Sequence, residues 1–172
     1  SKRVNRRLGD TMSVWGEFKE LAEKFECLSL SEGASVANPP PFLVSQLRPA
    51  IQEGHNQYCR NRGHPILVEA VAKFYSKRFG REIDPLNEVL VGSGGVALLY
   101  IFTLALTSPG DEVVLFEPAF PVFFDHIKLA ECTAKTAPLI YDSGTQSWKV
   151  DLEQFRRAFS AKTKLFILNT PQ

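Results

Sequence analysis

The sequence has few cysteines, and their pattern excludes two classes of protein. Its three cysteines, Cys27, Cys59 and Cys132, are far apart in the chain and form no C-x-x-C pair. Three scattered thiols argue against a disulfide framework and against a zinc site, and they favour a reducing compartment. We therefore expect a cytoplasmic protein with no bound metal.

The sequence also lacks a strong charge of either sign and a long apolar run. The formal net charge is +1 over 172 residues, whereas nucleic-acid binding requires a clustered basic face. The longest apolar run, residues 96–106, is interrupted by Tyr100 and Thr103 and falls short of the ~20 residues of a membrane helix. We expect neither nucleic acid nor a membrane as a partner, and no secretory signal peptide.

The one dense basic stretch precedes Asp10 and consists of Lys2, Arg3, Arg6 and Arg7. Transit peptides are rich in arginine and poor in acids. The stretch therefore leaves a mitochondrial location open as the alternative, although a solvated terminus is the simpler interpretation.

The first half of the chain predicts three helices. Apolar residues at helical spacing indicate a helix over residues 13–25, and a second is expected over residues 42–53. Pro49 should bend the second helix or end it early. The third, over residues 65–79, begins with a proline, which suits a first helical turn, and is followed by Gly80, a good helix stop.

From residue 88 onward, strands alternate with helices. Strands are expected at residues 88–91, 112–116, 132–137 and 164–168, and helices at 96–107, 122–130 and from Asp151, whose spacing to Gln154 fits a capping box. The helix over 96–107 is apolar nearly all round, which predicts that it is buried. This alternation is typical of an α/β fold with helices on both faces of a mainly parallel sheet.

The segment VGSGGVALLY, residues 91–100, runs from a predicted strand through glycines into a helix. Glycines let a backbone approach an anion, and the free N–H groups of a helix start point toward it. The segment fits a phosphate-binding turn, and a glycine-rich packing turn is an equally good interpretation. It is neither G-x-G-x-x-G nor a P-loop.

A second candidate is Phe120, which follows the next predicted strand and lies between Pro118 and Pro121. The two prolines restrict its backbone. An aromatic ring held at the carboxyl end of a strand is well placed to stack on a flat cofactor. We expect Phe123 and Phe124 to be core residues. We expect the three histidines, His55, His64 and His126, to be structural or solvent-facing.

Six segments together resemble the fold-type I pyridoxal-phosphate aminotransferases (class I/II). The resemblance is strongest to the kynurenine aminotransferases, which include glutamine transaminase K and cysteine-S-conjugate β-lyase. The segments occur in the family's order and cover nearly the whole chain: SVWGEF, SLSEG followed by PPP, NQYCRNRGHP, REIDPLNEVLVGSGG, PGDEVVLFEPAF and TKLFILNTP.

The resemblance implies a role for several residues around pyridoxal 5′-phosphate. The backbone of Gly95 and Val96 matches the family's phosphate-binding positions, and Phe120 matches the ring that stacks on the pyridine. Asn169 matches an asparagine at the edge of the cofactor. Tyr58 matches a tyrosine that reaches the phosphate of the neighbouring subunit, which implies a homodimer.

Two further matches concern the substrates, an amino acid and a 2-oxo acid. Gly33 matches the glycine that touches the substrate carboxylate, and Trp15 matches a tryptophan that lines the substrate pocket. The family's Schiff-base lysine is expected after Gln172, and no lysine of these 172 residues lies in a matching motif. No catalytic residue is assigned, and the chain alone is expected to be inactive.

The resemblance implies an N-terminal arm and small-domain segment over residues 1–54. The first, incomplete part of the large cofactor-binding domain is expected over residues 55–172. The implied activity is transfer of an amino group from an aromatic or bulky, kynurenine- or glutamine-like, amino acid to a 2-oxo acid. The alternatives are a non-catalytic fragment, a binding or dimerisation module, or a pyridoxal-phosphate lyase or synthase of the same fold.

Overall fold

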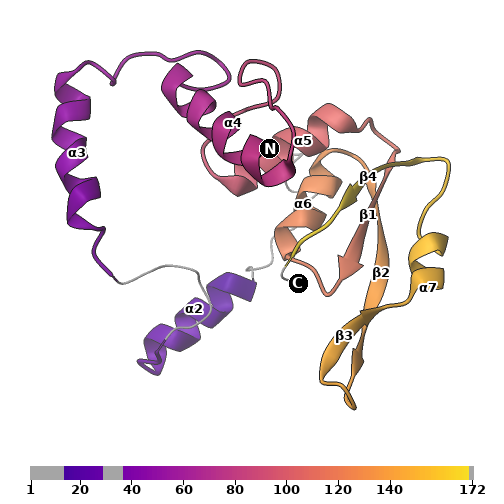
Figure 1. Ribbon diagram of the computed structural model, residues 1–172. Coiled ribbons are helices and arrows are strands. Elements are labelled where there is room, and N and C mark those ends of the chain that lie inside the picture. Colours follow the sequence, from indigo (N-terminus) through magenta and orange to yellow (C-terminus); the bar gives the residue numbers. More distant parts are fainter. Residues whose placement is uncertain (1–13, 29–36, 171–172) are drawn as a thin grey trace. The chain divides into compact units, whose positions relative to one another are not determined.

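The computed structural model describes residues 14–28 and 37–170 (Figure 1). These residues divide into two compact units. The first unit contains the described residues up to Val91, and the second begins at Gly92. Within the described ranges, no helix is long and apolar enough to cross a bilayer.

The first unit is helical. It contains α2 (Val14–Lys24), α3 (Pro41–Gln52) and α4 (Pro65–Phe79). All three helices were predicted, and α4 has the predicted bounds, with Gly80 in the left-handed conformation at φ 65°. Pro49 does not end α3, because the N–H of Glu53 still donates to the Pro49 carbonyl at 2.9 Å.

A small apolar core holds α4 to the segment that follows it. Val68 and Ala72 of α4 pack with Ile83 and Val89, and Val71 and Val91 lie against this cluster. The prediction of a strand over residues 88–91 is wrong. Val89 is buried as a strand residue would be, but Val91 donates its N–H to the Arg62 carbonyl at 2.9 Å, a loop contact rather than a strand ladder.

The second unit is built on a four-stranded sheet. Its strands are β1 (Glu112–Glu117), β2 (Thr133–Asp142), β3 (Ser147–Val150) and β4 (Thr163–Ile167), in the order β3-β2-β1-β4. The central strand β1 pairs in parallel with β2 and with β4, whereas β2 and β3 form an antiparallel hairpin. The sheet is therefore mixed and mainly parallel, as the alternation predicted.

Helices cover both faces of this sheet (Figure 1). Val113 and Leu115 of β1 pack against α6 (Pro121–Leu129) and against Leu99 of α5 (Gly95–Leu106). On the opposite face, Phe116 of β1 stacks on Phe155 of α7 (Leu152–Arg157), with ring centroids 5.0 Å apart. Successive side chains of a strand point to opposite faces, so β1 contributes to both layers.

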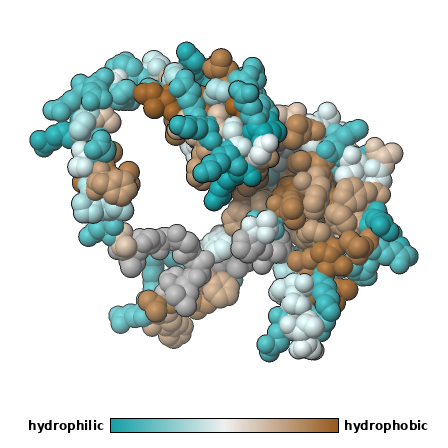
Figure 2. Space-filling view, in the orientation of Figure 1, coloured by the Kyte–Doolittle hydropathy of each residue, from teal (hydrophilic) through white to brown (hydrophobic). Residues whose placement is uncertain are grey.

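The prediction that the apolar helix α5 is buried is wrong. Thr103 is 1% exposed and satisfies its hydroxyl by donating to the Leu99 carbonyl at 2.8 Å. Much of the rest of the helix is open, including Val96, Ile101, Phe102, Leu104 and Leu106. Apolar side chains at the molecular surface are shown in brown in Figure 2. A helix that is apolar on every face needs neighbours that bury every face. The described residues bury only one face of α5.

The short helix α7 begins at the predicted cap. The Asp151 carboxylate accepts the backbone N–H groups of Glu153 and Gln154 at 2.9 and 3.0 Å. The Gln154 side-chain amide also donates to this carboxylate, at 2.9 Å. In a capping box this side chain would instead bond the backbone N–H of Asp151. These hydrogen bonds hold the pKa of Asp151 below its usual value.

Candidate functional site

The glycines before α5 form an open turn at the helix start. Gly94 has φ +90°, and a side-chain carbon built on Gly94 or Gly95 would meet nothing within 4 Å. The turn-to-helix hydrogen bond runs from the Leu98 N–H to the Gly94 carbonyl at 3.2 Å. The first N–H groups of an α-helix, here those of Gly95 and Val96, have no acceptor within the helix, so they are available to an anion.

Gly92 has a different role in the same turn. A side-chain carbon there would lie 2.7 Å from Cδ2 of Leu98. Leu98 thus folds back onto the backbone at Gly92, and this close approach fixes the entry into α5. The turn therefore has a close contact at Gly92 and open space at Gly94 and Gly95. A turn that only served packing would be in close contact at all three glycines.

Phe120 lies between the end of β1 and the start of α6. The chain leaves β1 through a cis peptide bond between Glu117 and Pro118, and Pro121 is the first residue of α6. The Phe120 ring is half-buried and meets Phe123 edge to face, with centroids 5.6 Å apart. Phe123 is buried, as predicted, at 4% exposure.

The sheet brings the ends of β1 and β4 to one edge. These strands are parallel neighbours, with Leu115 opposite Ile167, so Phe120 after β1 and Asn169 after β4 both follow the carboxyl ends of adjacent strands. Phe120 and Leu99 of α5 pack against the same buried cluster. The carboxyl ends of parallel strands are where α/β sheets bind ligands, so Phe120 and Asn169 follow the edge of the sheet at which a ligand is expected.

The other predicted site residues lie in the first unit or outside the described residues. Tyr58 is fully exposed in the loop between α3 and α4, and Trp15 on α2 is 39% exposed. Gly33 lies outside the described residues. The roles of Tyr58, Trp15 and Gly33 stay predictions.

Of the two alternatives expected for the histidines, structural or solvent-facing, the structural one holds for His126. His126 on α6 is 7% exposed, and no described residue supplies a hydrogen-bond partner for its Nδ1. Its ring packs on Tyr100 of α5 with centroids 5.2 Å apart. Phe123, His126, Ile127 and Ala130 are all buried, and their spacing explains this because residues at i, i+3, i+4 and i+7 share one helix face.

The burial of His126 predicts a pH-dependent stability. Burial lowers the pKa of His126 below the ordinary 6.5, and the nearby Asp125 carboxylate opposes this shift. The unfolded chain therefore binds a proton more readily than the folded one, so the free energy of unfolding should decrease as the pH falls from about 7 toward 5.

Urea unfolding at pH 7, 6 and 5 would test this prediction. His126→Leu should flatten the curve over this range, whereas His55→Gln, at an exposed histidine, should leave it unchanged. An equal pH dependence in the unaltered chain and in His126→Leu would contradict the prediction.

Comparison with known proteins identifies the family. A family model, aminotransferase class I and II, matches residues 26–172. The chain is 36% identical over 171 residues to a kynurenine–oxoglutarate transaminase of Dictyostelium discoideum, covering 92% of this chain and 39% of that protein. It is 33% identical over 177 residues to kynurenine–oxoglutarate transaminase 3 of Mus musculus, covering 99% and 39%.

A solved structure shares the fold of this part of the family. N-Succinyldiaminopimelate aminotransferase from Mycobacterium tuberculosis matches with a TM-score of 0.87 and 29% identity, covering 100% of this chain and 44% of that one. The chain spans about two-fifths of the length of the curated relatives that it matches. The family model covers most of the sequence, and the chain therefore belongs to the aminotransferase class I and II family.

Proposed function

We propose that this chain is the N-terminal part of a pyridoxal-phosphate-dependent aminotransferase. The enzyme would transfer an amino group from an aromatic or bulky, kynurenine- or glutamine-like, amino acid to a 2-oxo acid. Two relatives named kynurenine–oxoglutarate transaminase support this substrate class. The observation that carries the proposal is the open glycine turn at α5 within the same unit as Phe120, which follows the end of the central strand.

The residues of the second unit fit pyridoxal 5′-phosphate. A side chain at Gly94 or Gly95 would project into open space, so the turn leaves room for a phosphate beside the first amides of α5. When bound, the cofactor supplies an electron sink for reactions at the α-carbon of an amino acid, while the protein supplies binding and orientation.

Each predicted residue has a separate task in this proposal. The Gly95 and Val96 amides donate to the phosphate, and the Phe120 ring stacks on the pyridine and fixes its plane. Asn169 lies at the edge of the ring. Trp15 lines the substrate pocket, and Gly33 contacts the substrate carboxylate.

Tyr58 extends the proposal to the quaternary structure. Its fully exposed side chain is available to a neighbouring molecule, and we assign it to the cofactor phosphate of a second subunit in a homodimer. The N-terminal arm and small-domain segment then comprise residues 1–54, and the cofactor-binding domain begins at residue 55.

The proposal predicts where activity resides. The full-length protein that contains this chain should transfer the amino group of kynurenine to 2-oxoglutarate. The 172-residue chain alone should show no turnover, because none of its lysines matches the family's nucleophilic amine. Formation of glutamate would be followed by chromatography. Turnover by the 172 residues alone, or a full-length protein that is inactive with kynurenine, glutamine and phenylalanine, would contradict the proposal.

The proposed stacking role of the Phe120 ring can be tested by mutation. In the full-length protein, Phe120→Ala should weaken the affinity for pyridoxal 5′-phosphate roughly tenfold, since an aromatic stack contributes about 0.5–1.5 kcal/mol beyond its buried area. Phe120→Tyr keeps a ring in place and should bind nearly as the unaltered protein does.

Affinity would be measured by titrating the apoprotein with cofactor, and circular dichroism would check that each variant is folded. If Phe120→Ala folds and binds the cofactor as tightly as Phe120→Tyr, the stacking role is wrong.

A further inference from the structure

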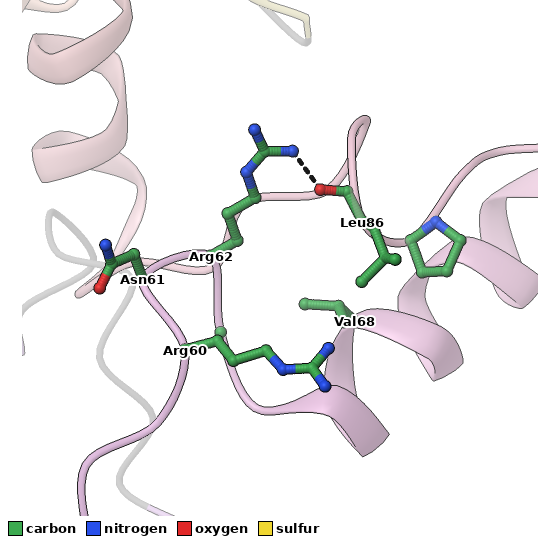
Figure 3. A pocket seen from close by; sticks show the side chains of 7 residues that line it. Arg60, Asn61, Arg62, Val68 and Leu86 are labelled. Carbon is green, nitrogen blue, oxygen red and sulfur yellow. Dashed lines mark hydrogen bonds between the residues drawn. The ribbon is translucent and has the colours of Figure 1, made fainter.

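The first unit contains a groove that none of the predicted site residues lines. It has a volume of about 340 Å³ and is formed by the loop before α4, by α4 itself and by the turn that follows Asp84. Its lining residues are Arg60, Asn61, Arg62, Gly63, Val68, Pro85 and Leu86 (Figure 3). Small-molecule sites in proteins begin at about 300 Å³, so the groove can hold a small organic ligand.

The loop that forms one wall of this groove is fixed at several points. The N–H of Gly63 donates to the Arg60 carbonyl at 2.9 Å, and the N–H of Val91 donates to the Arg62 carbonyl at 2.9 Å. Gly63 is buried, and a side-chain carbon there would lie 3.1 Å from Cγ1 of Val68. The backbone from which both arginines extend is therefore held against α4.

The two arginines differ in their contacts. The Arg62 guanidinium donates to the Leu86 carbonyl and, at 3.2 Å, to Oδ1 of Asn87. In Figure 3 the Arg60 side chain instead runs along the other edge of the groove, beneath Val68. No ion pair or hydrogen bond joins the Arg60 guanidinium to a described residue, whereas Arg81 in the same unit is paired with Glu88 at 2.8 Å.

The charge and the lining of the groove together select a type of ligand. No acidic residue lines it. The carboxylate of Asp84 accepts from Asn87 and from the Leu86 N–H, and these hydrogen bonds hold its pKa below the usual value. The lining also includes the apolar side chains of Val68, Pro85 and Leu86. The groove thus offers one uncompensated guanidinium beside an apolar wall.

We propose that this groove binds a small organic carboxylate with an apolar body. The carboxylate pairs with the guanidinium of Arg60, whose planar fork matches two carboxylate oxygens. The apolar body lies against Val68 and Leu86, while Arg62 keeps the Leu86 wall in place. The site is additional to the proposed cofactor site, and it does not depend on the proposed function.

A titration of the full chain followed by amide NMR signals would test this site. The probe is 4-methylpentanoate, and the matched neutral probe is 4-methylpentanamide. The carboxylate should produce saturable shifts centred on residues 60–63, 68 and 86, with an affinity about tenfold higher than that of the amide, because a hydrogen bond to a charged group is roughly twice as strong as a neutral one. Arg60→Gln should remove this preference, and Arg48→Gln, an exposed arginine on α3 outside the groove, should retain it.

Four results would overturn the proposal. They are the absence of saturable shifts, equal affinities for the carboxylate and the amide, shifts centred on Gly95 and Val96 instead of the groove, and binding of inorganic phosphate as tight as that of 4-methylpentanoate. The comparison of the two probes on the unaltered chain remains decisive if Arg60→Gln does not fold.

Discussion

Replacing Gly63 by alanine should lower the free energy of unfolding of the first unit by about 3 kcal/mol, from backbone strain and overpacking together. Gly63 is buried with φ +124°, a conformation that L side chains rarely adopt. The new methyl carbon would lie 2.9 Å from both Cβ and Cγ2 of Val91 and 3.1 Å from Cγ1 of Val68. Val68 or Val91 can move away from the new methyl group only by disturbing the small core that holds α4.

Gly80→Ala separates the two causes. Gly80 also has a positive φ, +65°, but a side-chain carbon there would meet nothing within 4 Å. Its replacement should therefore cost about 1 kcal/mol, which is the backbone penalty alone. Urea unfolding monitored through amide signals of residues 65–79 would give both values. Equal losses for the two variants would show that Val68 and Val91 do not crowd position 63.

Local signals in the sequence predicted the helices of the first unit well. Pro65 and Gly80 delimit α4 because their effects on the backbone act on one residue and its neighbours. Pro49 does not end α3 early. A proline removes one N–H donor from α3, but the chain past it still finds the Pro49 carbonyl as an acceptor, and the helix continues to Gln52.

Features that depend on distant partners were not predictable. Residues 88–91 have the composition of a buried strand, and Val89 is indeed buried, but a strand also needs a neighbour with which to form a ladder. The apolar surface of α5 predicted burial, yet Ile101 and Leu106 are 47% and 55% exposed. Hydrophobic periodicity indicates which side chains need to be buried, but it does not indicate which part of the protein buries them.

The candidate site was predictable only where it depends on local sequence signals. The alternation of strands and helices placed Phe120 and Asn169 after parallel strands, and the pairing of β1 with β4 brings both to one edge. No pattern in the sequence indicates the groove beside Arg60. It requires residues 60–63 to meet Pro85 and Leu86, and no short motif links segments more than twenty residues apart.

The buried cluster around Leu115 supports this edge of the sheet. Leu115→Ala should lower the free energy of unfolding of the second unit by about 3 kcal/mol, through lost burial and the cavity that remains. Leu115 is 1% exposed and packs in one cluster with Val113, Phe123 and Ile127. Leu168→Ala, at a side chain that is 63% exposed just past β4, should cost no more than about 0.5 kcal/mol.

Hydrogen exchange would show how far the loss at Leu115 extends. Leu99 of α5 and Phe120 before α6 pack against the same cluster, so the cavity weakens the support of both proposed cofactor-binding segments at once. The amides of α5 and α6 should then exchange faster together, by about two powers of ten for 3 kcal/mol. The amides of α4, in the first unit, should keep their rates. Faster exchange in α6 alone would mean that α5 is held in place by contacts other than the Leu115 cluster, and the glycine turn and Phe120 would then not share a common support.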